Sequence, residues 1–503
     1  MPHFRSILTL PLVMALALPT AGDARTRRPA QPAQPRTVQP FSNAERQQGA
    51  EAHQQIMREF GDAYTGAQAA YVRNVGQNIA VQSGLSSART DFTVTLLNSP
   101  VNNAFALPGG YIYTTRQLLA LMNNEAELAG VLGHEVGHTA ARHARQRESR
   151  SRRNAILGVL ATVLGGAIGD NGGLLGGIGG FLQNNAMQAA QLATLSFSRS
   201  QETEADDLGI RYLAGAGYDP AALSTVLASL AAQNALDVQA SGQSARAIPE
   251  WASTHPDPAS RVRRALDVAQ TLRITNGRTN RDGFMTAVNG VLYGDDPHQG
   301  VVEGRNFLHP DLRLGFTVPG GYGMQNGTTQ VAISGEGGQA IFTTLSFSGD
   351  RGDYLRRAFA SVAGENARIQ PSEMRETSVN GIPAFYGTAR VNSGQQVVDL
   401  TIFAYAFSGN QAFHFAAIAP AGRTNQWDAM FGSVRRLSTS EAAAIRPRRI
   451  SVVSVRRGDT IASLSGRMAY DSLREERFRV LNALAAGSAL AVGQRVKIVT
   501  YAN

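Results

Sequence analysis

The sequence has no cysteine, and charged residues make up only 17% of its 503 positions. The absence of cysteine excludes disulfides, thiolate zinc ligands, a cysteine nucleophile and a lipidated cysteine. A bound metal ion would therefore need histidine and carboxylate ligands. The chain is long enough for two to four domains at roughly 150 residues each, so a sizeable hydrophobic core is feasible.

The formal net charge of +9 raises the question of a nucleic-acid partner. The arginines are scattered through all segments, and basic residues do not alternate with aromatic ones. A basic balance of this kind affects solubility and non-specific association. We therefore expect no nucleic acid among the partners of this chain.

Residues 1–24 predict a secretory signal peptide, because an early Arg5 is followed by an apolar run from Ile7 to Leu18 and by small residues ending at Ala24. The run is shorter than the roughly 20 apolar residues that a membrane span needs, so export is favoured over an anchor. Residues 25–42 are rich in Pro, Arg and Gln and have too few apolar side chains to fold, which indicates a disordered linker.

Residues 43–278 are predicted to form one mainly helical domain, because apolar residues recur there three and four positions apart. The expected helices are Glu45–Phe60, Ala67–Ser83, Arg116–Leu121, Glu125–Glu148, Ser200–Gly215 and Pro220–Asn234. Two short strands, Phe92–Leu97 and Gly110–Thr114, are expected between them.

The segment 154–191 is apolar and unusually rich in glycine. A glycine-rich hairpin or lid packed on the domain is favoured, and an element in peripheral contact with a membrane is the alternative. Asp170 and Asn171 divide the run, and each half is too short to span a bilayer.

From residue 279 to 440 the pattern changes to short alternating strands separated by Gly, Asn and Pro, with one amphipathic helix at Asp353–Val362. This predicts an accessory α+β domain with an antiparallel sheet, and thus an α+β multidomain chain. The opening of this region, Phe307–Pro319, resembles the start of the PsbP/Mog-like α+β domains.

Residues 451–503 resemble a LysM domain in the order of their motifs. A Gly-Asp-Thr helix start at Gly458–Thr460 is followed by Leu481-Asn482 and then by Gly493-Gln494 before a last strand. The resemblance implies a small βααβ unit that contacts peptidoglycan, since LysM modules bind glycans containing N-acetylglucosamine. The charged middle, Arg474–Arg479, is longer than usual, and a unit that merely caps the rest of the chain is the alternative.

The motif His134-Glu135-x-x-His138 predicts a catalytic zinc site with one ion per chain. Residues four positions apart on a helix share a face, so both imidazoles can hold one cation. Glu135 cannot easily bind the same ion but can reach a water that the ion activates. It would take the proton as that water attacks a peptide carbonyl and pass it to the leaving nitrogen.

A catalytic zinc ion needs three protein ligands and one open position. The third ligand is expected on a separate helix that contains Ser198–Asp206. Glu202 and Asp206 share one face of that helix, and Glu204 points away from both. Spacing alone leaves Glu202 and Asp206 as equal candidates.

Three motifs together resemble peptidase family forty-eight (M48), over about residues 43–270. They are the runs Asn103–Thr115, Asn124–His138 and Arg199–Asp206. The family includes the BepA, LoiP and HtpX quality-control proteases and the CAAX prenyl proteases. The resemblance implies a zincin-type metalloprotease domain with Glu202 as the third zinc ligand, and with Asp206 behind a ligating histidine to orient it.

His255 lies in the segment Ser253–Arg261, which is similar to a Thr-His-Pro segment of BepA-like members. The resemblance implies that His255 can take the fourth zinc position in a resting state and act as a latch. A hydrogen-bond donor to the developing oxyanion and a plain loop histidine are the alternatives. His143 and Arg142 are interpreted as surface or supporting residues rather than ligands.

Zinc proteases of this layout pair an extended substrate by edge addition at the strand that corresponds to Gly110–Thr114, after Asn103–Ala106. We therefore expect Asn103, Ala104 and Phe105 near the substrate backbone. The sequence thus predicts a secreted zinc endopeptidase, periplasmic in a Gram-negative bacterium, that hydrolyses misfolded or misassembled envelope proteins. The expected partners are polypeptides, the outer-membrane assembly machinery, and peptidoglycan through the LysM-like unit. A latent chaperone-like factor closed by His255 and a peptidoglycan-targeted hydrolase are the alternatives.

Overall fold

The described part of the chain covers a little over three-quarters of its length. In the computed structural model it comprises residues 38–60, 63–145, 197–241, 255, 258–363, 369, 371, 373–393 and 396–502. The predicted signal peptide, most of the predicted linker and the glycine-rich segment 154–191 lie outside these residues. Among the described helices, none is both long enough and apolar enough to cross a bilayer.

The first part of the chain is mainly helical, as its apolar spacing predicts. Its helices are α1 (Asn43–Phe60), α2 (Ala67–Ala80), α3 (Arg116–Leu121), α4 (Glu125–Ala140), α8 (Arg199–Gly215), α9 (Ala222–Ser241), α11 (Pro258–Thr271) and α12 (Arg281–Val288), with 3-10 turns at Val81–Ser83 and Arg89–Asp91. The six helices expected from the sequence are present, and α11 and α12 are additional. The predicted Glu125–Glu148 helix is interrupted, because α4 ends at Ala140 and Arg142 adopts a φ of 54°.

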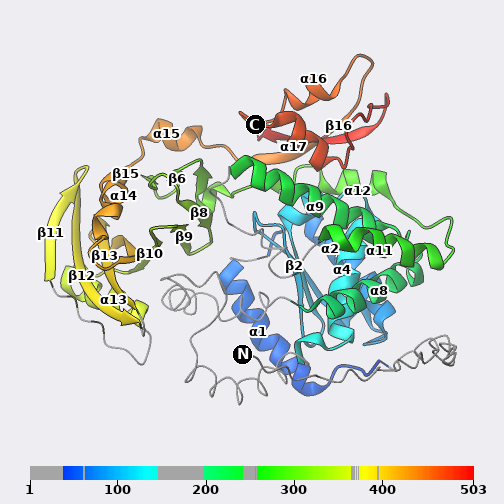
Figure 1. The fold of residues 1–503 in the computed structure, drawn as a ribbon, viewed down its shortest axis with the longest axis horizontal. Coiled ribbons are helices and arrows are strands. Elements are labelled where there is room, and N and C mark those ends of the chain that lie inside the picture. Colours follow the sequence, from blue (N-terminus) through cyan, green and yellow to red (C-terminus); the bar gives the residue numbers. More distant parts are fainter. Residues whose placement is uncertain are drawn as a thin grey trace, which may run out of the picture. The chain divides into compact units, whose positions relative to one another are not determined.

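A three-stranded sheet lies beside α2 and α4 (Figure 1). Its strands are β1 (Thr93–Leu97), β2 (Ala104–Leu107) and β3 (Tyr111–Thr115), in the order β1-β3-β2. β1 runs parallel to β3, and β2 runs antiparallel to it. The hairpin between β2 and β3 turns at Gly109, whose φ is 81° and where a Cβ would lie 2.6 Å from the carbonyl oxygen of Glu45.

Helix α4 is the centre of this domain, and every residue from Glu125 to His138 is buried. Small residues let α8 approach it closely. A Cβ on Gly137 would lie 2.9 Å from the carbonyl oxygen of Ala205, and one on Gly209 would lie 3.0 Å from the backbone nitrogen of His134. The two helix backbones therefore touch, which brings the side chains of α8 against those of α4.

The accessory region is an antiparallel seven-stranded sheet with helices, in agreement with the α+β prediction. Its strand order is β11-β12-β13-β14-β10-β9-β8. These strands are β8 (Gly323–Asn326), β9 (Gln330–Gly335), β10 (Gly338–Ser346), β11 (Glu373–Val379), β12 (Ile382–Ser393), β13 (Gln396–Ser408) and β14 (Gln411–Pro420). Helix α13 (Arg351–Ala363), at the position of the predicted helix, packs in one apolar cluster with this sheet.

A second apolar cluster joins the sheet to a smaller sheet of order β15-β7-β6-β5 and to α14. These elements are β5 (Val301–Glu303), β6 (Asn306–His309), β7 (Leu314–Thr317), β15 (Arg435–Arg436) and α14 (Asp428–Ser433). Short 3-10 helices lie at Pro297–Gln299 and Thr424–Trp427, and helix α15 spans Thr439–Ala444. Trp427 and Phe316 are fully or almost fully buried in this cluster.

The C-terminal region has the predicted βααβ order. It consists of β16 (Arg448–Ser454), α16 (Ile461–Ser465), α17 (Arg474–Leu481) and β17 (Arg495–Tyr501). β16 also pairs with β4 (Leu292–Tyr293), and Phe478 and Ile498 belong to the same apolar cluster as Leu128 of α4. This region therefore shares its core with the helical domain. Its relation to LysM domains stays a prediction.

Candidate metal centre and active site

The two histidines of α4 aim their Nε2 atoms at one point. The side chain of Asn124 caps the helix by accepting a hydrogen bond from the backbone N–H of Glu127. Helix α4 therefore begins at Glu125, nine residues before His134. The spacing of four residues places His134 and His138 on one face, and their Nε2 atoms lie 3.0 Å apart. Both side chains are buried.

Helix α8 supplies a carboxylate to the same point. It begins at a capping box in which Ser198 and Gln201 each accept from the other's backbone N–H. Glu202 follows in the first turn, and its Oε1 lies 3.4 Å from Nε2 of His138 while its Oε2 lies 3.6 Å from Nε2 of His134. Only 2% of the Glu202 side chain is exposed.

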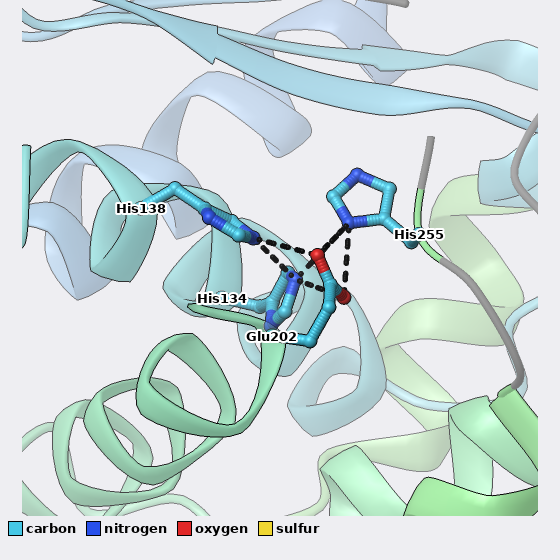
Figure 2. A group of neighbouring side chains, drawn as sticks. All are labelled: His134, His138, Glu202 and His255. Carbon is cyan, nitrogen blue, oxygen red and sulfur yellow. Dashed lines mark hydrogen bonds and ion pairs between the residues drawn. The ribbon is translucent and has the colours of Figure 1, made fainter. Parts of the chain in front are cut away.

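His255 completes the group. Its Nδ1 lies 3.1 Å from Oε1 of Glu202 and 3.4 Å from Nε2 of His134. One ligand atom from each of the four residues lies within 4.8 Å of every other (Figure 2). The four residues that the sequence suggested as ligands or latch are thus brought together.

The spacing of these atoms fits a small tetrahedral cation. Ligand atoms placed tetrahedrally about 2.0–2.1 Å from a zinc ion lie roughly 3.3–3.4 Å from one another. The contacts of His134, His138 and His255 with Glu202 and of His134 with the other two histidines run from 3.0 to 3.6 Å. Three imidazoles and one carboxylate also match the ligand types that a cysteine-free zinc site uses.

Asp206 and Arg261 lie behind the ligands. Oδ1 of Asp206 is 2.9 Å from Nδ1 of His134, which fixes the proton of that ring on Nδ1 and puts the lone pair that can bind a cation on Nε2. Arg261, on α11, donates to both oxygens of Asp206 and forms an ion pair with Glu202 at 2.6 Å. The sequence reasoning gave Arg261 no role, although two buried carboxylates without a nearby cation were a signal for one.

These contacts keep both carboxyl groups ionised. Burial opposes ionisation of Glu202, but the surrounding His255, His138 and His134 outweigh it and hold its pKa well below the ordinary value. Burial likewise opposes ionisation of Asp206, yet His134 and Arg261 lower its pKa to about 2. Burial lowers the pKa of His138, so its ring is neutral and able to act as a ligand.

Glu135 points into the same space. It is 1% exposed, and burial raises its pKa to about 8. Its Oε1 accepts no hydrogen bond among the described residues, and Nε2 of His255 lies 3.6 Å away. A buried carboxyl group of this kind, beside the ligands but not among them, is suited to exchange a proton with a molecule in the site.

The backbone of β2 borders the site, and its side chains do not all face it. Ala104 and Phe105 lie in β2, which the sequence did not predict as a strand, and Asn103 precedes it. The ring of Phe105 stacks on Tyr113 at 4.7 Å in a separate apolar cluster, so only its backbone is available to a substrate. β2 is an edge strand of its sheet, whereas the predicted strand Gly110–Thr114 forms the middle strand β3. Ala106 of β2 and His138 help to line a cavity of about 50 Å³.

The family model described as "Peptidase family M48" matches residues 66–269. A "Beta-barrel assembly-enhancing protease" of Yersinia pestis is 29% identical over 54% of this chain and 50% of its own length. A "Mitochondrial metalloendopeptidase OMA1" of Schizosaccharomyces pombe is 31% identical over 46% of this chain and 64% of its own length. The "Beta-barrel assembly-enhancing protease" of Escherichia coli K12 is 29% identical over 48% of this chain and 46% of its own length.

The chain spans about half to two thirds of the length of these relatives. The matched region includes the four ligand candidates, Glu135 and Asp206, and it ends before the accessory region.

Proposed function

We propose that the chain is a zinc-dependent endopeptidase of peptidase family M48, the family whose model matches residues 66–269. The observation that carries the proposal is the convergence of His134, His138 and Glu202 on one point with the separations of a tetrahedral zinc site. The family's named relatives are proteases and metalloendopeptidases, which supports the same reaction class.

A zinc ion held by these residues would supply Lewis-acid activation of water and of the scissile carbonyl. Glu135 accepts the proton of the attacking water and returns it to the leaving nitrogen. Its burial supports this role, because a carboxyl group with a pKa of about 8 gains and loses a proton readily near neutral pH. Asp206 and Arg261 hold His134 and Glu202 in place.

We assign His255 the role of a latch. Nδ1 of His255 lies beside Glu202 and His134, so this histidine would take the fourth position of a zinc ion held by His134, His138 and Glu202. Water and substrate enter only after this histidine leaves.

The proposed substrates are misfolded or misassembled proteins of the cell envelope. Relatives that are named for enhancing β-barrel assembly support a link to outer-membrane assembly and a periplasmic location. In the same proposal, the LysM-like C-terminal unit contacts peptidoglycan. The edge strand β2 pairs with the extended substrate.

The test uses the mature chain beginning after Ala24, with casein as the substrate. Wild type is expected to cleave slowly and His255→Ala faster, because the substitution opens the fourth position. A pull-down on isolated peptidoglycan and incubation with muropeptides separate an anchor from a wall hydrolase, since the proposal predicts binding without cleavage. If wild type and His255→Ala each bind one zinc ion and neither cleaves casein, the protease assignment is wrong. The latent, chaperone-like alternative then gains support.

A further inference from the structure

The two histidines of α4 are supported by different groups. Nδ1 of His134 faces the buried carboxylate of Asp206 at 2.9 Å. Nδ1 of His138 faces Nδ1 of a third histidine, His143, at 2.9 Å. The second ligand therefore has an imidazole where the first has a carboxylate.

The position of each proton in this second contact follows from the geometry. Nε2 of His138 points at the other ligands, so it must present a lone pair to a cation, and the proton of that ring lies on Nδ1. Nδ1 of His143 must then be the acceptor, and the proton of His143 lies on Nε2. That atom is 3.2 Å from Oε2 of Glu204, which accepts it.

A break in the helix makes this chain of hydrogen bonds possible. On a continuous helix, His143 would lie five residues beyond His138 and about 140° around the axis, away from it. Arg142 instead adopts a left-handed φ of 54°, which turns the chain back after α4. Its guanidinium donates to Glu45 at 2.9 Å and to the carbonyl oxygen of Gln39 at 3.1 Å, and these contacts hold the turn.

The burial of the two supporting residues differs. His143 is fully buried, while 45% of the Glu204 side chain is exposed. Glu204 lies on α8, two residues after the ligand Glu202, so one helix supplies both a ligand and the end of this chain. A surface carboxylate is thereby joined to the metal site through two rings.

We propose that His143 and Glu204 are positioning residues for zinc, which fix the proton on Nδ1 of His138 and the orientation of its ring. The inference rests on the zinc-dependent function proposed above. Loss of a group that orients a ligating histidine typically weakens metal binding about 10- to 100-fold. The effect reaches zinc only through His138, because neither residue is within the ligand group.

The test measures zinc affinity by competition with a chromophoric chelator, and the visible absorption spectrum of the cobalt-substituted full chain. His143→Leu and Glu204→Leu are expected to weaken zinc binding, His143→Leu by about 10- to 100-fold and Glu204→Leu less. Both should change the cobalt ligand-field bands. His143→Gln, whose side-chain oxygen can accept from His138, should recover part of the affinity and most of the wild-type spectrum.

The matched control is Asp207→Asn, on the same helix, where the carboxylate pairs with Arg264 and not with a ligating ring. It should bind zinc and cobalt as wild type does. If His143→Leu does not fold, Glu204→Leu decides, because the side chain of Glu204 is partly exposed. Zinc affinities and cobalt spectra equal to those of Asp207→Asn in the folded variants would overturn the inference. If wild type itself binds no zinc, the proposed function fails instead.

Discussion

Lys497 donates a hydrogen bond from its Nζ to the carbonyl oxygen of Ala120 at 2.7 Å, although the two residues are 377 positions apart. The same ammonium group also bonds the carbonyl oxygens of Leu121 and Met122. These carbonyls end α3 just before α4 begins. The last strand of the chain thus holds the turn from which the helix of the metal centre starts.

Lys497 is the only lysine in the sequence, and it is fully buried. Burial lowers its pKa, and burial raises the pKa of Glu127, which lies nearby in the first turn of α4. An ammonium group offers three donors in a compact arrangement, which suits three converging carbonyls better than the planar guanidinium of arginine.

Replacing Lys497 with methionine is expected to destabilise the protein by about 3 kcal/mol or more. The substitution leaves the buried carbonyl oxygens of Ala120 and Met122 without the ammonium donor, and it removes one of the two positive charges near Glu127, of which Arg281 remains. Urea unfolding of the full chain measures the loss. The exposed Arg456→Met in the same C-terminal unit should change the free energy of unfolding by less than about 0.5 kcal/mol, and an equal effect of the two substitutions would contradict this role.

Much of the candidate site could be predicted from the sequence, because it depends on short-range spacing. His134 and His138 share a face on any helix, and Glu202 and Asp206 do so on the next one. The family resemblance, rather than the spacing, favoured Glu202 over Asp206 as the ligand. The helices around them also followed from their apolar periodicity.

The missed features depend on single backbone conformations or on tertiary contacts. The left-handed residue Arg142 ends α4 and turns His143 toward the site, whereas the sequence pattern continued a helix to Glu148. Strand β2 has only four residues and no alternation, so no pattern marked it. The shared core of the C-terminal region was expected only in the alternative that this unit caps the rest of the chain, although a lone lysine among 47 basic residues was a signal for a special position.

Removal of the Arg261 guanidinium should affect the metal-free protein most. Arg261→Leu leaves Glu202 and Asp206 as buried carboxylates without their cation, and the metal-free chain should lose about 3–5 kcal/mol. A zinc ion supplies positive charge to the same carboxylates, so the loss with zinc should be smaller. Melting temperatures with chelator and with zinc test this. Arg264→Leu, whose ion pair with Asp207 is partly exposed, should cost less than about 1 kcal/mol in both conditions.

The close approach of α4 and α8 predicts different results for two glycines of one helix. Gly137→Ala places a methyl group 2.9 Å from the carbonyl oxygen of Ala205 and should push α8, with its Glu202, away from the histidines. Gly130→Ala meets its neighbours at 3.5 Å, which is ordinary contact, and should stabilise the helix by up to about 1 kcal/mol. Zinc affinity should fall in Gly137→Ala alone, and equal affinities would contradict the packing argument.

Acid should weaken the accessory region through His414. Its ring is fully buried against the hydroxyl group of Tyr354, and burial lowers its pKa from 6.5 to about 4. In the unfolded chain His414 therefore binds a proton near pH 6.5, whereas in the folded chain it binds one only near pH 4. Stability is complete above pH 6.5 and falls by roughly 3 kcal/mol as the pH drops to 4, at about 1.36 kcal/mol per pH unit.

Fluorescence of Trp427 during urea unfolding measures this pH dependence. Trp427 is buried in the accessory region, and Trp251 is the only other tryptophan, so a Trp251→Phe background isolates the signal. His414→Leu in that background should remove most of the slope between pH 4 and pH 6.5. A slope unchanged by the substitution would show that other groups cause it.

The most direct test of the central claim compares wild type with Glu135→Gln at equal zinc content. The account predicts one zinc ion per chain in both proteins, measured by elemental analysis, because Glu135 is not a ligand. It predicts casein cleavage by wild type that falls about 10²- to 10⁴-fold in Glu135→Gln, since proton transfer is lost while the metal site stays intact. Equal cleavage by the two proteins, or zinc binding that depends on Glu135, would contradict it.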